Sequence, residues 1–115
     1  MTPGSISACE TDRAALQRLR DALGAEALSM LADSCAQDLD EACAGLAAPS
    51  LDGETVKKLA HKMAGLLGQY ACPSASAFAR GLAQGAAGDA LAAAGLLAER
   101  GRACAAELRA LAAAP

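Results

Sequence analysis

The chain has 115 residues, of which 54% are hydrophobic and 20% are charged, so it is sized for one domain and too apolar to be disordered. A net charge of −3 and an aromatic content of 2% argue against a nucleic-acid-binding protein. No apolar run reaches the roughly 18–20 residues of a membrane span. Alanine fills 33 positions and β-branched residues are rare, which predicts an all-α fold.

The N-terminal residues 1–9, with Pro3 and Gly4, are expected to form a flexible tail ahead of a single domain at 10–113. The opening MTPGSISACETDR lacks the basic start and apolar stretch of a signal peptide, so we expect a cytoplasmic protein.

The cysteines are odd in number and widely spaced, and no two form a CxxC pair. In a reducing compartment we expect them to act as small apolar side chains. With one histidine and no ligand pair at finger spacing, a zinc site is not expected. The five are Cys9, Cys35, Cys43, Cys72 and Cys104.

Two helices are predicted in the first half of the chain. The first begins near Thr11 or Asp12 and ends at Gly24, and the second spans about residues 25–47, before Pro49. The apolar stripe of the first helix is Leu16, Leu19 and Leu23. That of the second is Leu28, Leu31, Cys35, Leu39, Ala42 and Leu46, while Asp33, Asp38, Asp40 and Glu41 lie away from its centre.

Three more helices are predicted in the second half. Asp52 is expected to cap the third, which reaches Tyr70 or Ala71, and the fourth follows Cys72-Pro73-Ser74 and fades at Gly85 and Gly88. Asp89 is expected to cap a fifth helix that runs to about Ala112. Its buried stripe is Leu97, Gly101, Cys104, Leu108 and Leu111. Short connections predict antiparallel neighbours, so we expect an up-and-down four-helix bundle with an additional short N-terminal helix.

The third helix carries the only histidine of the chain. Its apolar residues fall within one narrow arc of a helical wheel, and His61 lies about 140° from Val56, on the opposite face. We therefore expect an exposed imidazole, largely in its nucleophilic neutral form at neutral pH. Lysines one turn away can compensate the charge of an incoming phosphoryl group. The apolar arc is Val56, Leu59, Ala60, Met63, Leu67 and Tyr70, and the neighbours of His61 are Lys57, Lys58, Ala64, Gly65 and, two turns on, Gly68.

This segment resembles the histidine-containing phosphotransfer (HPt) domain of bacterial phosphorelays. Ala60-His61, the apolar Met63 and Gly65 match the family motif. Ala75, Phe78, Ala79 and Leu82 keep step with the family's next helix, and Gly88-Asp89 resembles the entry to its last segment, so the resemblance covers roughly residues 11–112.

One position departs from the family pattern. The lysine that the family carries three residues after its histidine is Ala64 in this chain. Our hypothesis is that Lys57 or Lys58 supplies the missing charge; Lys62 points about 100° away but has a long, flexible stem.

The resemblance implies a phosphoryl carrier and not an enzyme with kinase activity of its own. His61 would accept a phosphoryl group from a receiver-domain aspartate and pass it to another response regulator. The implied partners are receiver domains and a hybrid sensor histidine kinase, with Mg²⁺ bound by the receiver and no cofactor bound by this chain. Docking is expected beside His61, where Ala64, Gly65 and Gly68 are small, with Lys57, Lys58 and Lys62 facing an acidic receiver pocket. We expect a monomer.

Three alternatives remain open at the level of sequence. A helical interaction module would bind a partner helix without phosphate, and an inactive HPt relative would occupy a receiver-docking surface. A metal- or haem-binding bundle would use Met30 or Met63 with His61, but Met63 is predicted to face inward and no Glu-x-x-His pair exists.

Overall fold

The computed structural model describes residues 13–69 and 72–113, and at Arg13, Gln69 and residues 111–113 only the backbone. Within these ranges the chain forms six helices and no strand, which confirms the predicted all-α class. The expected tail at residues 1–9 lies outside them. The helices are α1 Arg13–Leu23, α2 Ala25–Leu46, α3 Gly53–Gln69, α4 Pro73–Gln84, α5 Ala87–Ala92 and α6 Ala94–Ala113.

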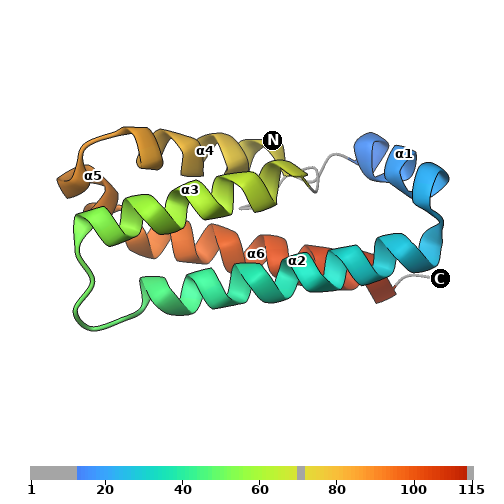
Figure 1. Cartoon of the computed structure of the whole chain (residues 1–115), viewed down its shortest axis with the longest axis horizontal. Coiled ribbons are helices and arrows are strands. Elements are labelled where there is room, and N and C mark those ends of the chain that lie inside the picture. The colour runs from blue at the N-terminus through green and yellow to red at the C-terminus, as the bar shows by residue number, and fades with distance from the viewer. Residues whose placement is uncertain (1–12, 70–71, 114–115) are drawn as a thin grey trace, which may run out of the picture.

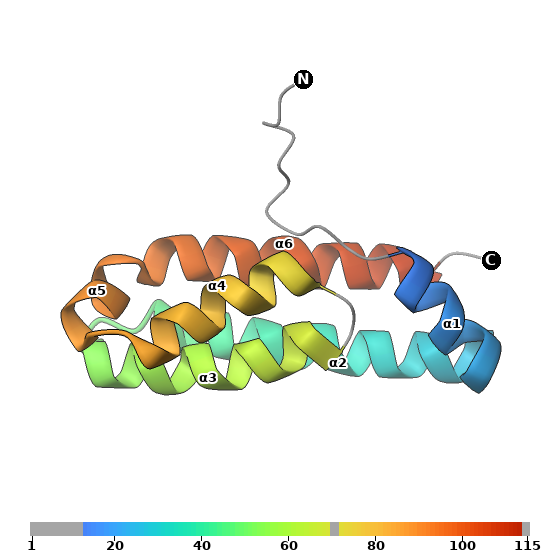
Figure 2. The same cartoon turned by 90° about the horizontal axis from the view of Figure 1, so that it is seen from above.

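The helices pack mainly as two pairs, α2 against α6 and α3 against α4 (Figure 1). The short α5 turns the chain at one end of the molecule, and α1 folds over the far end of α2. Seen from above, α4 lies between α3 and α6 (Figure 2). Between α1 and α2 the chain reverses at Gly24, whose φ of +91° favours glycine and whose N–H donates to the Arg20 carbonyl at 2.8 Å, so the predicted end of the first helix is confirmed.

The apolar stripe of α2 differs in part from the prediction. Leu31 is 40% exposed and Leu28 only partly buried, while Ala32 and Ala36 are buried. The physical reason is length: the N-terminal part of α2 reaches beyond α3, so only α1 and α6 can cover it (Figure 1). The rest of the predicted stripe is buried, and none of the four acidic residues is.

The prediction of a single helix from Asp89 to Ala112 is wrong. The chain forms α5 and α6 in this region, divided at Ala93. The N–H of Ala93 donates to the carbonyls of both Asp89 and Ala90 and so tightens the last turn of α5. Asp89 does not cap a helix but lies in the first turn of α5, which begins after Ala86. The predicted stripe of α6 is buried at its four positions with described side chains; the Leu111 side chain is not among them.

The core is closely packed where α2, α3 and α6 meet. A Cβ added at Gly101 of α6 would come within 2.5 Å of the Met63 Cε atom and 2.6 Å of the Cys43 Sγ atom. The Cys43 thiol also donates to the Ala98 carbonyl at 3.4 Å. The absent side chain at Gly101 therefore lets α6 lie directly on α2 and α3.

The described cysteines only partly match their predicted role. Cys35, Cys43 and Cys72 are buried and form no disulfide, as expected of small apolar side chains. Burial raises the pKa of the Cys35 thiol to about 12 and also raises that of Cys43, so both stay protonated and unreactive. Cys104 is buried but disulfide-bonded, which differs from the expectation. Cys9 lies outside the described residues.

Across the described ranges, no helix is both long enough and apolar enough to cross a lipid bilayer.

Two glycines of α6 should respond oppositely to alanine. Gly101→Ala should destabilise the fold by about 1–3 kcal/mol, because the new methyl group overlaps two fully buried side chains. Gly95→Ala should be neutral or stabilise it by about 0.5 kcal/mol, because a Cβ there meets nothing within 4 Å. Urea unfolding of both variants measures the difference; equal effects would contradict the close approach at Gly101.

Candidate functional site

The helix that carries His61 begins at a side-chain cap. The backbone N–H of Thr55 donates to Asp52 Oδ1 at 2.8 Å, which confirms the predicted capping role of Asp52. This hydrogen bond lowers the pKa of the Asp52 carboxyl group, since it stabilises the ionised form. The cap fixes the start of α3 and hence the residues that make up each later turn.

The rotation of α3 is set by its buried side. Val56, Ala60 and Met63 are 0% exposed, and Leu67 is 1% exposed. Leu59 packs against the same core from its edge. The predicted apolar arc is thus confirmed where side chains are described; Tyr70 lies outside the described residues. His61 precedes Met63 by two residues, so at 100° per residue it lies about 160° around the helix from Met63. His61 must therefore point outward, and it is exposed.

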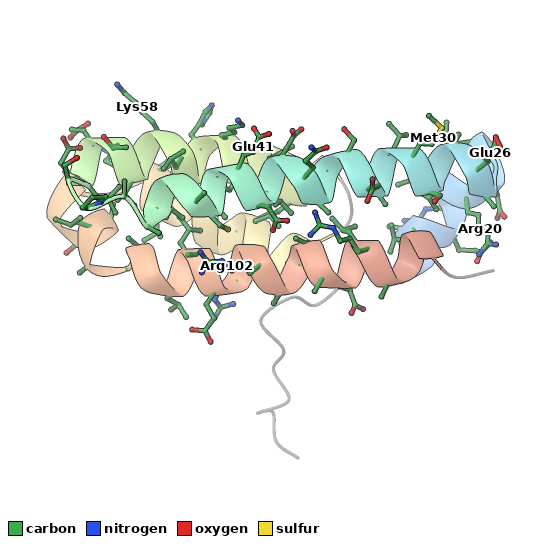
Figure 3. The ribbon with its side chains drawn as sticks, turned by 90° about the horizontal axis from the view of Figure 1, so that it is seen from below. Arg20, Glu26, Met30, Glu41, Lys58 and Arg102 are labelled. Atoms are coloured by element: carbon green, nitrogen blue, oxygen red, sulfur yellow. The ribbon has the colours of Figure 1, made fainter. Side chains whose placement is uncertain are left out.

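The predicted site residues on α3 differ in exposure and in the side of the helix on which they lie. Lys58, His61 and Gly65 form an outer strip of exposed residues spaced three to four apart. Lys57 is partly buried and Lys62 is exposed. Figure 3 shows Lys58 extending from α3 into solvent on the same side as Glu41 of α2.

The side of α3 that faces α2 carries Lys62 and opposing carboxylates. The Cys35 thiol donates to the Leu66 carbonyl at 3.7 Å, and a Cβ at Gly45 would lie 3.1 Å from a Leu59 methyl group. We call Leu59, Lys62 and Leu66 the α2 flank of α3. On α2, Asp38 and Glu41 lie between these two contacts and border the same flank. Lys62 therefore lies on the side of α3 that borders α2, about 100° around the helix from His61.

The side of α3 that faces α4 carries Lys57, Ala64 and Gly68, which we call the α4 flank. The hydroxyl group of the buried Ser76 of α4 donates to the Ala64 carbonyl at 2.9 Å. A Cβ at Gly68 would lie 3.1 Å from the Ser76 Oγ atom. His61 is three residues before Ala64 and therefore borders this flank. The sequence did not single out Ser76, because a serine in an alanine-rich helix gives no sign of its partner.

These contacts change the predicted roles of two small residues. Ala64 is only 7% exposed and belongs to the core, so it does not offer the open docking surface that was predicted. Gly68 is exposed, but its lack of a side chain serves to make room for Ser76 of α4. Of the three small residues, Gly65 alone is exposed with nothing within 4 Å of an added Cβ.

The chemistry available here is that of an exposed imidazole near cations. Two cations, Lys57 and Lys58, lie one turn before His61 on either side of it. In the described part of the chain, no three His, Cys, Asp or Glu side chains are grouped so as to hold a metal ion. The site therefore offers a nucleophile and positive charge on a convex helical surface.

Comparison with known protein families, with curated proteins and with solved structures gives no match to this chain.

Removing the cap at Asp52 should weaken the fold in an acid-dependent way. Asp52→Ala should lower the melting temperature at neutral pH, whereas Asp52→Asn should largely preserve it, because an amide oxygen also accepts the Thr55 N–H bond.

The pH dependence follows from the lowered pKa of Asp52 in the folded state. Its stabilisation is complete above the unfolded-state pKa and is lost as pH falls through the folded-state value. Circular dichroism melts from neutral pH to about pH 3 should show wild type losing stability relative to Asp52→Asn. A constant difference between the two across that range would contradict the cap.

The orientation of α3 predicts opposite costs at two nearby positions. His61→Gln should leave the free energy of unfolding within about 0.5 kcal/mol of wild type, because the ring is exposed. Met63→Ala should cost about 2–5 kcal/mol, since it empties a fully buried site. Denaturant unfolding measures both, and a large loss in His61→Gln would place the ring in the core.

Proposed function

We propose that this chain is a phosphoryl carrier of the HPt type, in which His61 is the phosphoacceptor. The observation that carries the proposal is the rotation of α3: the only histidine is exposed beside Lys57 and Lys58, while the turn on the opposite side is fully buried. We further propose that α2, α3, α4 and α6 act as an up-and-down four-helix bundle, the architecture expected of such a carrier. The carrier would act as a cytoplasmic monomer.

The transfer step needs little from this chain beyond a positioned nucleophile. The lone pair of the neutral His61 ring, at Nε2, attacks the phosphorus of a receiver aspartyl phosphate. As the N–P bond forms, the acyl P–O bond breaks and the aspartate carboxylate leaves with its electron pair. The Nδ1 proton stays on the ring until solvent removes it. The reverse reaction passes the group to a second receiver, whose Mg²⁺ balances the phosphoryl charge.

The surroundings of His61 support this role in two ways. The exposed Gly65, one turn after His61, lets a partner backbone approach the ring closely. Lys57 and Lys58 add positive charge beside it, which favours an acidic receiver pocket despite the net charge of −3.

The test is phosphotransfer from a panel of radiolabelled phospho-receiver domains with Mg²⁺. We expect at least one receiver to label wild type with acid-labile, alkali-stable phosphate, and none to label His61→Gln, which keeps its fold because the ring is exposed. Absence of label from every receiver would overturn the proposal. Binding of a receiver without transfer would favour an inactive relative, and absence of binding would leave a helical interaction module.

The charge proposed for Lys57 or Lys58 is tested in the same assay. Lys57→Ala or Lys58→Ala should slow labelling by about two- to fivefold, the effect of one exposed charge pair. Lys62→Ala is the control, because Lys62 lies on the α2 flank near Asp38 and Glu41. Labelling rates that are unchanged in both Lys57→Ala and Lys58→Ala would contradict the role proposed for these lysines.

A further inference from the structure

The packing of α4 on α3 brings a cation level with His61 that the linear sequence keeps 19 positions away. Two contacts show how α4 runs along α3. Near one end of α3, Ser76 of α4 faces Gly68 and donates to the Ala64 carbonyl, and at the other end a Cβ at Gly53 would overlap the carbonyl of Ala87, the first residue of α5, so α4 runs antiparallel to α3. Between these contacts, one turn forward along α4 corresponds to one turn back along α3. Residue 80, one turn after Ser76, is therefore level with residues 60–64.

Arg80 also lies on the correct side of α4. It is four residues after Ser76, so the two side chains share the face of α4 that is turned to α3. Ser76 is buried in the seam between the helices, whereas Arg80 is exposed at its outer edge. Packed helices lie about 8–10 Å apart, a gap that an extended arginine side chain can cross.

The structure of the seam leaves room for this side chain. The α4 flank of α3 at this level presents Ala64, whose side chain is a single methyl group and is buried. The exposed α4 neighbours of Arg80 are Ala77, Gly81 and Gln84, which carry no charge. A group bound to the outer side of His61 thus meets a guanidinium and no carboxylate from α4.

The other flank has the opposite charge. Asp38 and Glu41 border the α2 flank and repel an anion there, although Lys62 offsets part of their charge. On α3 itself, Glu54 lies two turns before His61, and Lys57 and Lys58 lie between them. A phosphoryl group on His61 is consequently drawn toward the α4 flank.

We propose that Arg80 of α4 pairs with the phosphoryl group carried by His61, so that the anion site is shared between two helices. A guanidinium binds phosphate oxygens by two parallel N–H···O bonds, which a lysine cannot do. Arg80 prolongs the phosphorylated state, because a nearby cation disfavours ring protonation, the step that makes imidazole a good leaving group. This inference rests on the proposed function.

The test loads His61 without any receiver. Potassium phosphoramidate transfers its phosphoryl group to imidazole: the His61 Nε2–P bond forms, the P–N bond of the reagent breaks and ammonia is released. Because the chain has one histidine, loading is confined to one site. The readouts are the rate of phosphate loss at neutral pH and the midpoint of the pH titration followed by the ³¹P chemical shift.

We expect Arg80→Gln to lose phosphate about two- to fivefold faster than wild type and to move the titration midpoint to higher pH. Arg80→Lys should restore part of both changes, since it keeps the charge. The matched control is Arg102→Gln: Arg102 is also an exposed arginine, but it lies on α6, away from α3 (Figure 3). Circular dichroism verifies that all variants fold.

The inference is overturned if Arg80→Gln matches wild type and Arg102→Gln in both readouts. Its failure is distinct from failure of the proposed function, because chemical loading needs no partner. A receiver panel that gives no label would overturn the carrier role, while a shifted titration would still locate Arg80 at the phosphoryl group.

Discussion

The burial of Met63 beside Gly101 of α6 holds the apolar side of α3 toward the core. A side chain at Gly101 would come too close to the ends of the Met63 and Cys43 side chains, so these would have to shift within the core. With Met63 held in the core, the helical repeat places His61 on the opposite side of α3, which faces solvent. The exposure of the histidine is thus a consequence of core packing, and the role proposed for His61 depends on that packing.

The same constraint separates the two flanks of α3 chemically. On one flank, the acidic residues of α2 oppose Lys62. On the other, Ser76 binds the Ala64 carbonyl and sets α4 in a register that brings Arg80 level with His61. His61, the proposed nucleophile, would therefore lie between an acidic neighbour and a basic one, and this asymmetry would orient a bound phosphoryl group.

Sequence periodicity predicted much of this arrangement and failed for identifiable reasons. The arc from Val56 to Leu67 and the cap at Asp52 are local properties of one helix, so the sequence alone predicted them correctly. The exposure of Leu31 depends on α2 extending beyond α3, which the periodicity of α2 does not record. The apolar pattern also continues across Ala93, so it gave no sign of the break there. The burial of Ala64 and the register of Arg80 both follow from how α4 packs on α3, which a single helical wheel cannot show.

The central claim is that the imidazole held outward by the Met63 contact carries the phosphoryl group. The most direct measurement is the ¹⁵N spectrum of the His61 ring before and after incubation with a phospho-receiver. The account predicts that Nε2 acquires a coupling to phosphorus while Met63 and its core neighbours keep their chemical shifts. An unchanged ring, or a phosphoryl group bound to any other residue, would contradict it.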